Sequence, residues 1–167
     1  HAFQIPAGRT FHRYDFRYPG DEFKLGFGRQ VRGETWVTHY GENHRQSSIL
    51  AIEAENEKHP ILRGVKDLHV QAGGYTAYPL APSTTLLRGI ILNGMAKDSP
   101  VDTSKHLMPV AWVREYTSAS SKIARIFTTT QGASEDILNE GFRRVLVNAH
   151  LWCLSLEDQI REDNPVE

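Results

Sequence analysis

The chain has 167 residues and a formal net charge of −1 at pH 7, a length that suits one domain and leaves no room for a second large one. Lysine and arginine are scattered rather than clustered, which argues against nucleic acid or an anionic membrane surface as a partner. No apolar run is long enough to span a bilayer, and no signal peptide is visible. The single cysteine, Cys153, cannot form an internal disulfide, so we interpret it as a buried, unreactive thiol.

The first twenty residues are rich in aromatic rings and are broken by glycine and proline, so we expect irregular structure with one short helical turn. Two interpretations of these rings stay open. They can line a sugar site, because the apolar face of a pyranose packs on a ring, or they can simply cover the edge of a sheet. The rings concerned are those of Phe3, Phe11, His12, Tyr14, Phe16 and Tyr18.

Hydrophobic residues and glycines alternate between residues 21 and 41, a pattern that predicts short helices separated by glycine turns. The segment that follows places His39, Glu42 and His44 on a glycine-containing loop. Two imidazoles and a carboxylate can share a metal ion or transfer protons near neutral pH. Their spacing matches no specific zinc signature, and on residue types alone a plain polar surface loop is the simpler interpretation.

Four strands and one long helix are predicted along the rest of the chain. β-branched and aromatic residues between turn-forming residues place the strands at residues 47–53, 84–92, 109–116 and 122–130. The helix is expected to begin at Ser134, with Glu135 and Asp136 near its positive end, and its apolar residues recur at steps of three and four up to Cys153. We expect residues 109–156, two strands and a helix, to form the unit around which the chain is organised.

Several short motifs occur in a characteristic order and spacing. They are residues 1–3, 26–28, 33–36, 39–44, 59–64, 109–116 (PVAWVREY), 124–132 (ARIFTTTQG) and 152–157 (WCLSLE). Together they resemble the trehalose utilisation (ThuA-like) family, whose end pattern is a similar Pro-x-x-Trp-x-x-Glu strand, a strand into Thr-Thr-x-Gly, and a helix finishing in Trp-x-x-Gly-Leu-Glu.

The resemblance implies an α/β fold with a flavodoxin-like, three-layer sheet of the class I glutamine amidotransferase-like type. Residues 1–167 would then be roughly the carboxyl-terminal two-thirds of one ThuA-like domain, with the amino-terminal part missing. The compartment, bacterial cytoplasm or periplasm, is therefore left unknown. Thiol catalysis and glutamine hydrolysis are rejected, because Cys153 lies on the final helix and not on a sharp strand-to-helix turn.

Two departures from the family pattern bear on chemistry. Residues 71–78 lack the acidic pair that many relatives carry on the loop before the tyrosine, and Gly132-Ala133 stands where many relatives have Gly-His. The Gly-Ala form also occurs in a subgroup similar to this chain. A site of the implied type would therefore depend more on His1 and on the loop from His39 to His44.

The resemblance places His1 at the carboxyl edge of the sheet, where open α/β sheets carry their sites. We therefore expect His1, His39 and His44 to converge as catalytic residues, acting as metal ligands or as acid/base groups. His39 and His44 would be the possible ligands of a divalent metal such as zinc. The substrate-binding residues would be Trp36, as a wall, together with Arg114, Thr130 and Gln131. Arg114 is alternatively an ion-pair partner of its neighbour Glu115.

The leading hypothesis is a protein that acts on or binds trehalose-like disaccharides or their keto derivatives, so that its partner is a small carbohydrate. The alternative is a non-catalytic sugar-binding or interaction domain, which the two departures and the abundant aromatic residues favour. A third hypothesis is a structural domain appended to a larger secreted or electron-transfer protein. Convergence of the three histidines would favour the enzyme, whereas an aromatic groove without paired ionisable groups would favour the binder. An unpaired sheet edge would invite association into a homo-oligomer.

Overall fold

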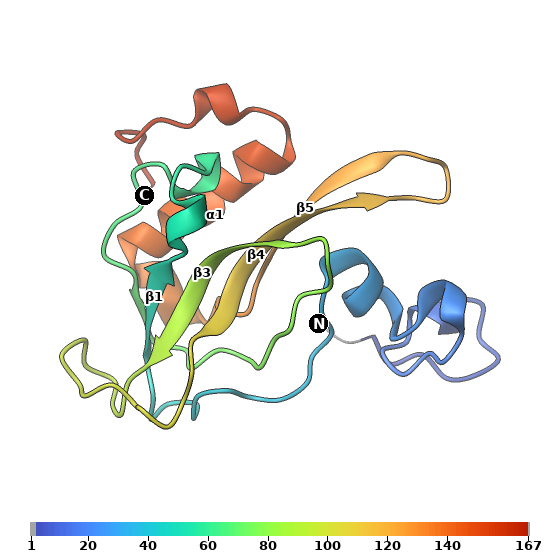
Figure 1. The fold of residues 1–167 in the computed structure, drawn as a ribbon, viewed down its shortest axis with the longest axis horizontal. Helices are drawn as coiled ribbons and strands as arrows, with labels where there is room; N and C mark the ends of the chain where they lie inside the picture. The colour runs from blue at the N-terminus through green and yellow to red at the C-terminus, as the bar shows by residue number, and fades with distance from the viewer. Residues whose placement is uncertain (1–2, 167) are drawn as a thin grey trace.

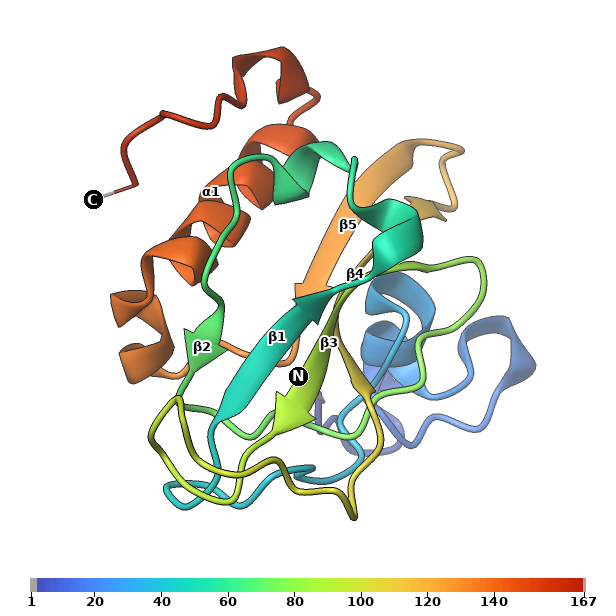
Figure 2. The ribbon, with the colours of Figure 1, turned by 60° about the vertical axis from the view of Figure 1, so that its left-hand side comes forward.

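The computed structural model describes residues 3–166, and its centre is an antiparallel sheet of five strands in the order β2-β1-β3-β4-β5 (Figures 1 and 2). The strands are β1 (Ser48–Ile52), β2 (His69–Val70), β3 (Thr84–Ile91), β4 (Met108–Thr117) and β5 (Ile123–Thr129). All four longer strands predicted from the sequence are confirmed within a few residues at each end. Strands β3, β4 and β5 follow one another as a meander, and β5 forms one edge of the sheet.

The expected flavodoxin-like α/β architecture is wrong. That architecture requires parallel strands joined by crossover helices. Every pairing among the named strands between residues 3 and 166 is antiparallel, and this part of the chain holds one α-helix, α1 (Glu140–Cys153). Residue composition predicts that a segment is a strand but not its direction. The short connection from Ser118 to Lys122 sets the direction here, because only antiparallel neighbours can be joined by so tight a turn.

Short helical turns surround the sheet. They are η1 (His12–Tyr14), η2 (Asp21–Phe23), η3 (Gly28–Arg32), η4 (Ala54–Asn56), η5 (Pro60–Leu62), η6 (Ser134–Leu138) and η7 (Glu157–Gln159). The short helices predicted between residues 21 and 41 are confirmed by η2 and η3. The π-helix η3 ends at Gly33, whose φ of 90° lies in the left-handed region that favours glycine.

The long helix begins at Glu140, six residues after the predicted start at Ser134. The hydroxyl group of Ser134 bonds to Glu135 and caps no backbone amide. The cap is Asn139, whose side-chain oxygen accepts a hydrogen bond from the amide of Phe142 at 2.8 Å. Both residues carry an oxygen suited to capping, so the sequence pattern alone did not distinguish the two starting points.

Asp136, in η6, explains why the chain does not continue as one helix. Its side chain is fully buried, and one carboxylate oxygen accepts hydrogen bonds from the amides of Gln71 and Ala72 at 2.7 and 3.0 Å. The other oxygen accepts from Gly132 and Ala133 at 2.9 and 3.0 Å. One carboxylate therefore joins the segment after β2 to the segment after β5.

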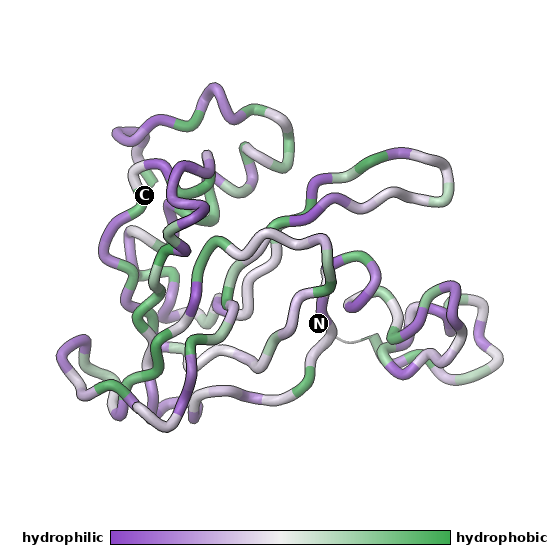
Figure 3. The backbone as a smooth tube through the Cα atoms, in the orientation of Figure 1, coloured by the Kyte–Doolittle hydropathy of each residue, from purple (hydrophilic) through white to green (hydrophobic). Residues whose placement is uncertain are grey.

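The hydrophobic core lies between the sheet and α1. Its largest fully buried members include Phe142 of α1, together with Leu86 and Leu87 of β3. Figure 3 shows hydrophobic stretches along the strands where they cross the middle of the molecule. Cys153, at the end of α1, is half-buried, and this burial raises the pKa of its thiol above the ordinary value. None of the helices within residues 3–166 has the length and apolar character needed to cross a membrane.

Candidate functional site

The amino-terminal segment, residues 3–32, lies on the side of the sheet away from α1 (Figures 1 and 2). The buried carboxylate of Asp15 holds this segment together by accepting hydrogen bonds from the amide of Ile5 at 2.6 Å and from the amide of Arg17 at 2.8 Å. The Arg17 guanidinium also donates to this carboxylate, and this bond is the largest cause that lowers the pKa of Asp15 to about 2. A Cβ at Gly26 would lie 2.2 Å from the Asp15 carbonyl oxygen, so this close approach requires glycine.

The segment is attached to the sheet through the last residue of η3. The indole N–H of Trp112 donates to the backbone carbonyl of Arg32 at 2.8 Å, and the hydroxyl of Thr128 donates to the same oxygen at 3.1 Å. Trp112 is only 1 % exposed, so the donor of this bond is a buried side chain. Trp112 is thus a core residue whose polar edge fixes the amino-terminal segment.

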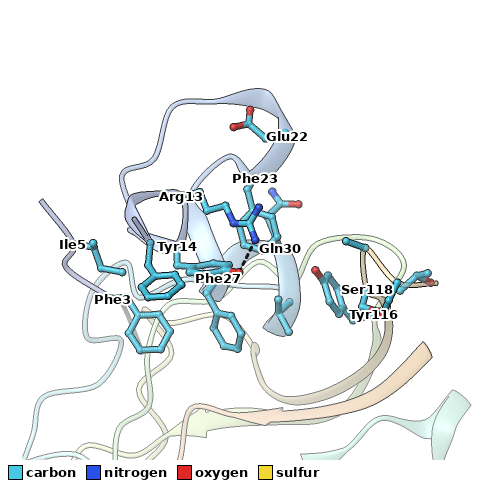
Figure 4. A pocket seen from close by; sticks show the side chains of 15 residues that line it. Phe3, Ile5, Arg13, Tyr14, Glu22, Phe23, Phe27, Gln30, Tyr116 and Ser118 are labelled. Carbon is cyan, nitrogen blue, oxygen red and sulfur yellow. Dashed lines mark hydrogen bonds between the residues drawn. The ribbon is translucent and has the colours of Figure 1, made fainter. Parts of the chain in front are cut away.

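A cavity of about 1060 Å³ opens between this segment and the hairpin that joins β4 to β5 (Figure 4). Six aromatic residues line it: Phe3, Phe11, Tyr14, Phe23, Phe27 and Tyr116. The rings support one another, because Tyr14 and Phe23 meet edge to face with centroids 5.4 Å apart, as do Phe3 and Phe27. Tyr116 and Ser118 face them from the hairpin. Of the six rings singled out between residues 3 and 20, Phe3, Phe11 and Tyr14 line this cavity, whereas His12, Phe16 and Tyr18 do not.

Polar groups are few and stand among these rings. The lining contains one cation, Arg13, and one carboxylate, Glu22. The Arg13 guanidinium lies over the ring of Tyr14 and donates to the Tyr14 hydroxyl at 2.8 Å, while Glu22 accepts a hydrogen bond from Tyr18. The Arg13–Tyr14 bond raises the pKa of Arg13. The cavity combines apolar ring faces with hydrogen-bonding groups and holds no pair of carboxylates.

A second candidate region lies where the segment after η3 meets the loop before β3. The ring of His39 contacts those of Trp36 and Tyr75, with centroids 6.2 and 5.3 Å away. Tyr75 also lines a small cavity of about 50 Å³ with Trp36, and a neighbouring cavity of about 310 Å³ with Gln131. Thr130 lines both cavities. Of the residues expected to bind substrate, Trp36, Thr130 and Gln131 therefore lie together, and His39 lies beside them.

The expected histidine cluster is not formed by the described residues. His1 lies outside residues 3–166. His44 lines a different cavity, of about 90 Å³, with Met95 and Glu135. Between residues 3 and 166, no group of three or more His, Cys, Asp and Glu side chains could hold a metal ion. His39 and His44 thus do not form, with any described third residue, the site that a zinc ion would need.

Arg114 lies on the same sheet face as Trp112 but does not line the cavities of Thr130 and Gln131. Its Nε and Nη1 atoms are buried, and neither has a hydrogen-bond partner among the described residues. Burial lowers the pKa of Arg114, and the nearby charge of Arg29 lowers it further. Arg114 forms no ion pair with Glu115 in the structure. The alternative interpretation, in which Arg114 pairs with its neighbour Glu115, is therefore wrong.

Several residues of these sites were not predicted. Arg32, Thr35 and Tyr75 line the small cavity, and Asp136 positions the loop beside the larger one. The sequence carried one usable signal, the pair Gly73-Gly74, because adjacent glycines indicate a close approach of backbones. Gly73 indeed meets Gly41, whose amide donates to the Gly73 carbonyl at 2.9 Å.

Comparison of the chain with protein-family models, with curated proteins and with solved structures finds no match. The resemblance to the ThuA-like family therefore stays a prediction.

Proposed function

We propose that this chain is a non-catalytic carbohydrate-binding domain that holds a neutral disaccharide of trehalose size in the aromatic cavity. The observation that carries the proposal is the cavity of about 1060 Å³ with six aromatic residues in its lining. Small-molecule sites measure about 300–1,000 Å³ and combine apolar walls with a few polar groups, so this space is ample for two sugar rings.

The chemistry of the lining supports a sugar rather than a purely apolar ligand. The apolar face of a pyranose packs on an aromatic ring, and Phe11, which is 62 % exposed, offers such a ring. Gln30 and the hydroxyl of Ser118 offer groups that can donate and accept hydrogen bonds around the edge of the sugar.

Binding without turnover is favoured over hydrolysis. Most glycoside hydrolases use two carboxyl groups on either side of the bond that breaks. Glu22 is the single carboxylate among the described residues that line the cavity, and it is hydrogen-bonded to Tyr18.

Calorimetric titration of the chain with trehalose and maltose tests the proposal. We expect saturable binding that Phe11→Ala weakens by about tenfold or more, because stacking area is lost. Phe11 is largely exposed, stacks on Tyr14 and is not a member of the core, so this variant should fold normally. Leu138→Ala is the matched control, since Leu138 is 80 % exposed on η6 and lines no part of the cavity. No binding of either disaccharide, or equal affinity of wild type and Phe11→Ala, would overturn the proposal.

A further inference from the structure

The two small cavities around Tyr75 form a second candidate site, separate from the aromatic cavity although η3 contributes to both linings. They share Tyr75, Thr129 and Thr130 as common walls. Arg32 lines the smaller one and Gln131 the larger one. A ligand that reached both would therefore meet Arg32 in the smaller cavity, Gln131 in the larger one and the threonine hydroxyls in either.

Unpaired polar atoms gather around this shared wall. The hydroxyl oxygens of Thr35 and Thr130 and both amide atoms of Gln131 are buried, and none has a hydrogen-bond partner among the described residues. Gln131 as a whole is only 5 % exposed. Buried polar groups are nearly always paired with protein, water or ligand, so a cluster of unpaired ones indicates that a partner from outside the chain belongs there.

Gly74 packs closely against this cluster. A Cβ at this position would lie 3.0 Å from the Gln131 amide nitrogen and 3.4 Å from the Thr130 hydroxyl oxygen. The loop that carries Gly74 is held in place, because the Gly74 carbonyl accepts a hydrogen bond from the Tyr40 amide at 3.0 Å. The position of this loop beside Thr130 and Gln131 is thus part of the fold.

The charge of the site is positive. Arg32 is half-buried, its side chain has no hydrogen bond or ion pair among the described residues, and burial lowers its pKa. The neighbouring carboxylate of Glu34 does not balance it, because Glu34 pairs with Arg29 at 3.1 Å and accepts hydrogen bonds from the amides of Thr35 and Tyr78. A half-buried cation without a partner favours an anionic ligand.

We infer that the cavities around Tyr75 bind a small hydroxylated carboxylate, such as a sugar acid. Its carboxylate would pair with the Arg32 guanidinium, which can donate two parallel hydrogen bonds. Its hydroxyl groups would satisfy the Thr130 hydroxyl and the Gln131 amide. The inference is independent of disaccharide binding in the aromatic cavity, because the two linings share no residue.

Titration with gluconate, glucose and inorganic phosphate, each used alone, tests the inference. We expect gluconate to bind the wild-type chain and Arg32→Gln to weaken it by about tenfold or more, because a charge-assisted bond is lost. The hydrogen bond from Trp112 is accepted by the backbone carbonyl of Arg32 and not by its side chain, so this variant keeps it. Arg161→Gln is the matched control, the same substitution at an exposed arginine outside these cavities.

Thr130→Val is a second variant, which distinguishes a loss of binding from a loss of stability. It removes the unpaired hydroxyl at nearly constant shape, so we expect an equal or higher melting temperature without ligand and about tenfold weaker gluconate binding. The inference is overturned if gluconate does not bind, or if Arg32→Gln and Arg161→Gln bind it equally. It is also overturned if glucose binds as tightly as gluconate, since the negative charge of the ligand would then be irrelevant. Phosphate binding as tightly as gluconate would overturn it too, since any oxyanion would then suffice.

Discussion

Trp112 and Arg32 are joined by a hydrogen bond of 2.8 Å, from the indole N–H to the backbone carbonyl. This bond links the sheet to η3, which contributes Gln30 and Val31 to the aromatic cavity and Arg32 to the smaller one. Both candidate sites therefore depend on how this one turn is docked.

Replacement of Trp112 by Phe removes the donor and keeps an aromatic ring in the core. We expect the free energy of unfolding to fall by about 1–3 kcal/mol, because the Arg32 carbonyl keeps only the Thr128 hydroxyl as a partner. Disaccharide affinity should fall as well, since η3 would be held less firmly. Trp152→Phe is the matched control, because Trp152 packs against His59 on the other side of the molecule. Unchanged affinity in Trp112→Phe would show that the docking of η3 does not shape the cavity.

Replacement of Asp136 by Asn tests the carboxylate that joins two loops. One side-chain oxygen would be exchanged for an NH₂ group that faces two amide donors. We expect a loss of about 3 kcal/mol in the free energy of unfolding, measured by urea denaturation, because buried donors lose their acceptor. The neighbouring exposed substitution Glu135→Gln should change stability by less than about 0.5 kcal/mol. Equal effects of the two variants would contradict the structural role of Asp136.

The pH dependence of the amino-terminal segment follows from Asp15. Its pKa is about 2 in the folded chain against an ordinary 3.8, chiefly because of the hydrogen bond from Arg17. The unfolded chain therefore binds more protons in this range, and stability rises with pH. The stabilisation is complete above pH 3.8 and is lost as the pH falls through about 2.

Hydrogen exchange measures this directly. We expect the protection factors of the Ile5 and Arg17 amides to be constant from neutral pH down to about 4 and to fall below it. Asp15→Asn should give low protection at every pH, with no such step. A step of the same size in that variant would assign the pH dependence to another group.

Replacement of Phe142 by Ala should strongly lower the free energy of unfolding. Phe142 is fully buried between α1 and the sheet, so truncation leaves a cavity and should lower the free energy of unfolding by about 3–5 kcal/mol. Leu138→Ala, four residues earlier and mostly exposed, should have almost no effect in the same denaturation experiment. A small effect of Phe142→Ala would mean that α1 is not packed as described.

Local chemistry was sufficient to predict the strands but not their arrangement. The runs now seen as β3, β4 and β5 carry β-branched and aromatic residues that suit a parallel or an antiparallel sheet equally well. The direction of each strand depends on the connections between strands. The resemblance to an α/β family implied crossover helices, which the structure does not have at these positions. The start of α1 was misplaced for a related reason, because Ser134 and Asn139 both have capping chemistry and the burial of Asp136 decides between them.

The candidate sites were predictable in part. Trp36, Thr130 and Gln131 were expected together and do line adjoining cavities. His44 lies on a loop and lines a different cavity. Loop residues have no periodicity from which this position could have been predicted. The aromatic cavity needs Tyr116 and Ser118 of the hairpin, about a hundred positions from Tyr14 in sequence, so only the tertiary fold brings its two sides together.

The most direct test of the account is a chemical-shift titration of the isotope-labelled chain with trehalose. The account predicts that the amides perturbed on binding lie in residues 11–31 and 116–120, around the aromatic cavity, while those of residues 72–76 and 130–133 stay unchanged. Perturbations confined to the second group, or no perturbation at saturating sugar, would contradict it.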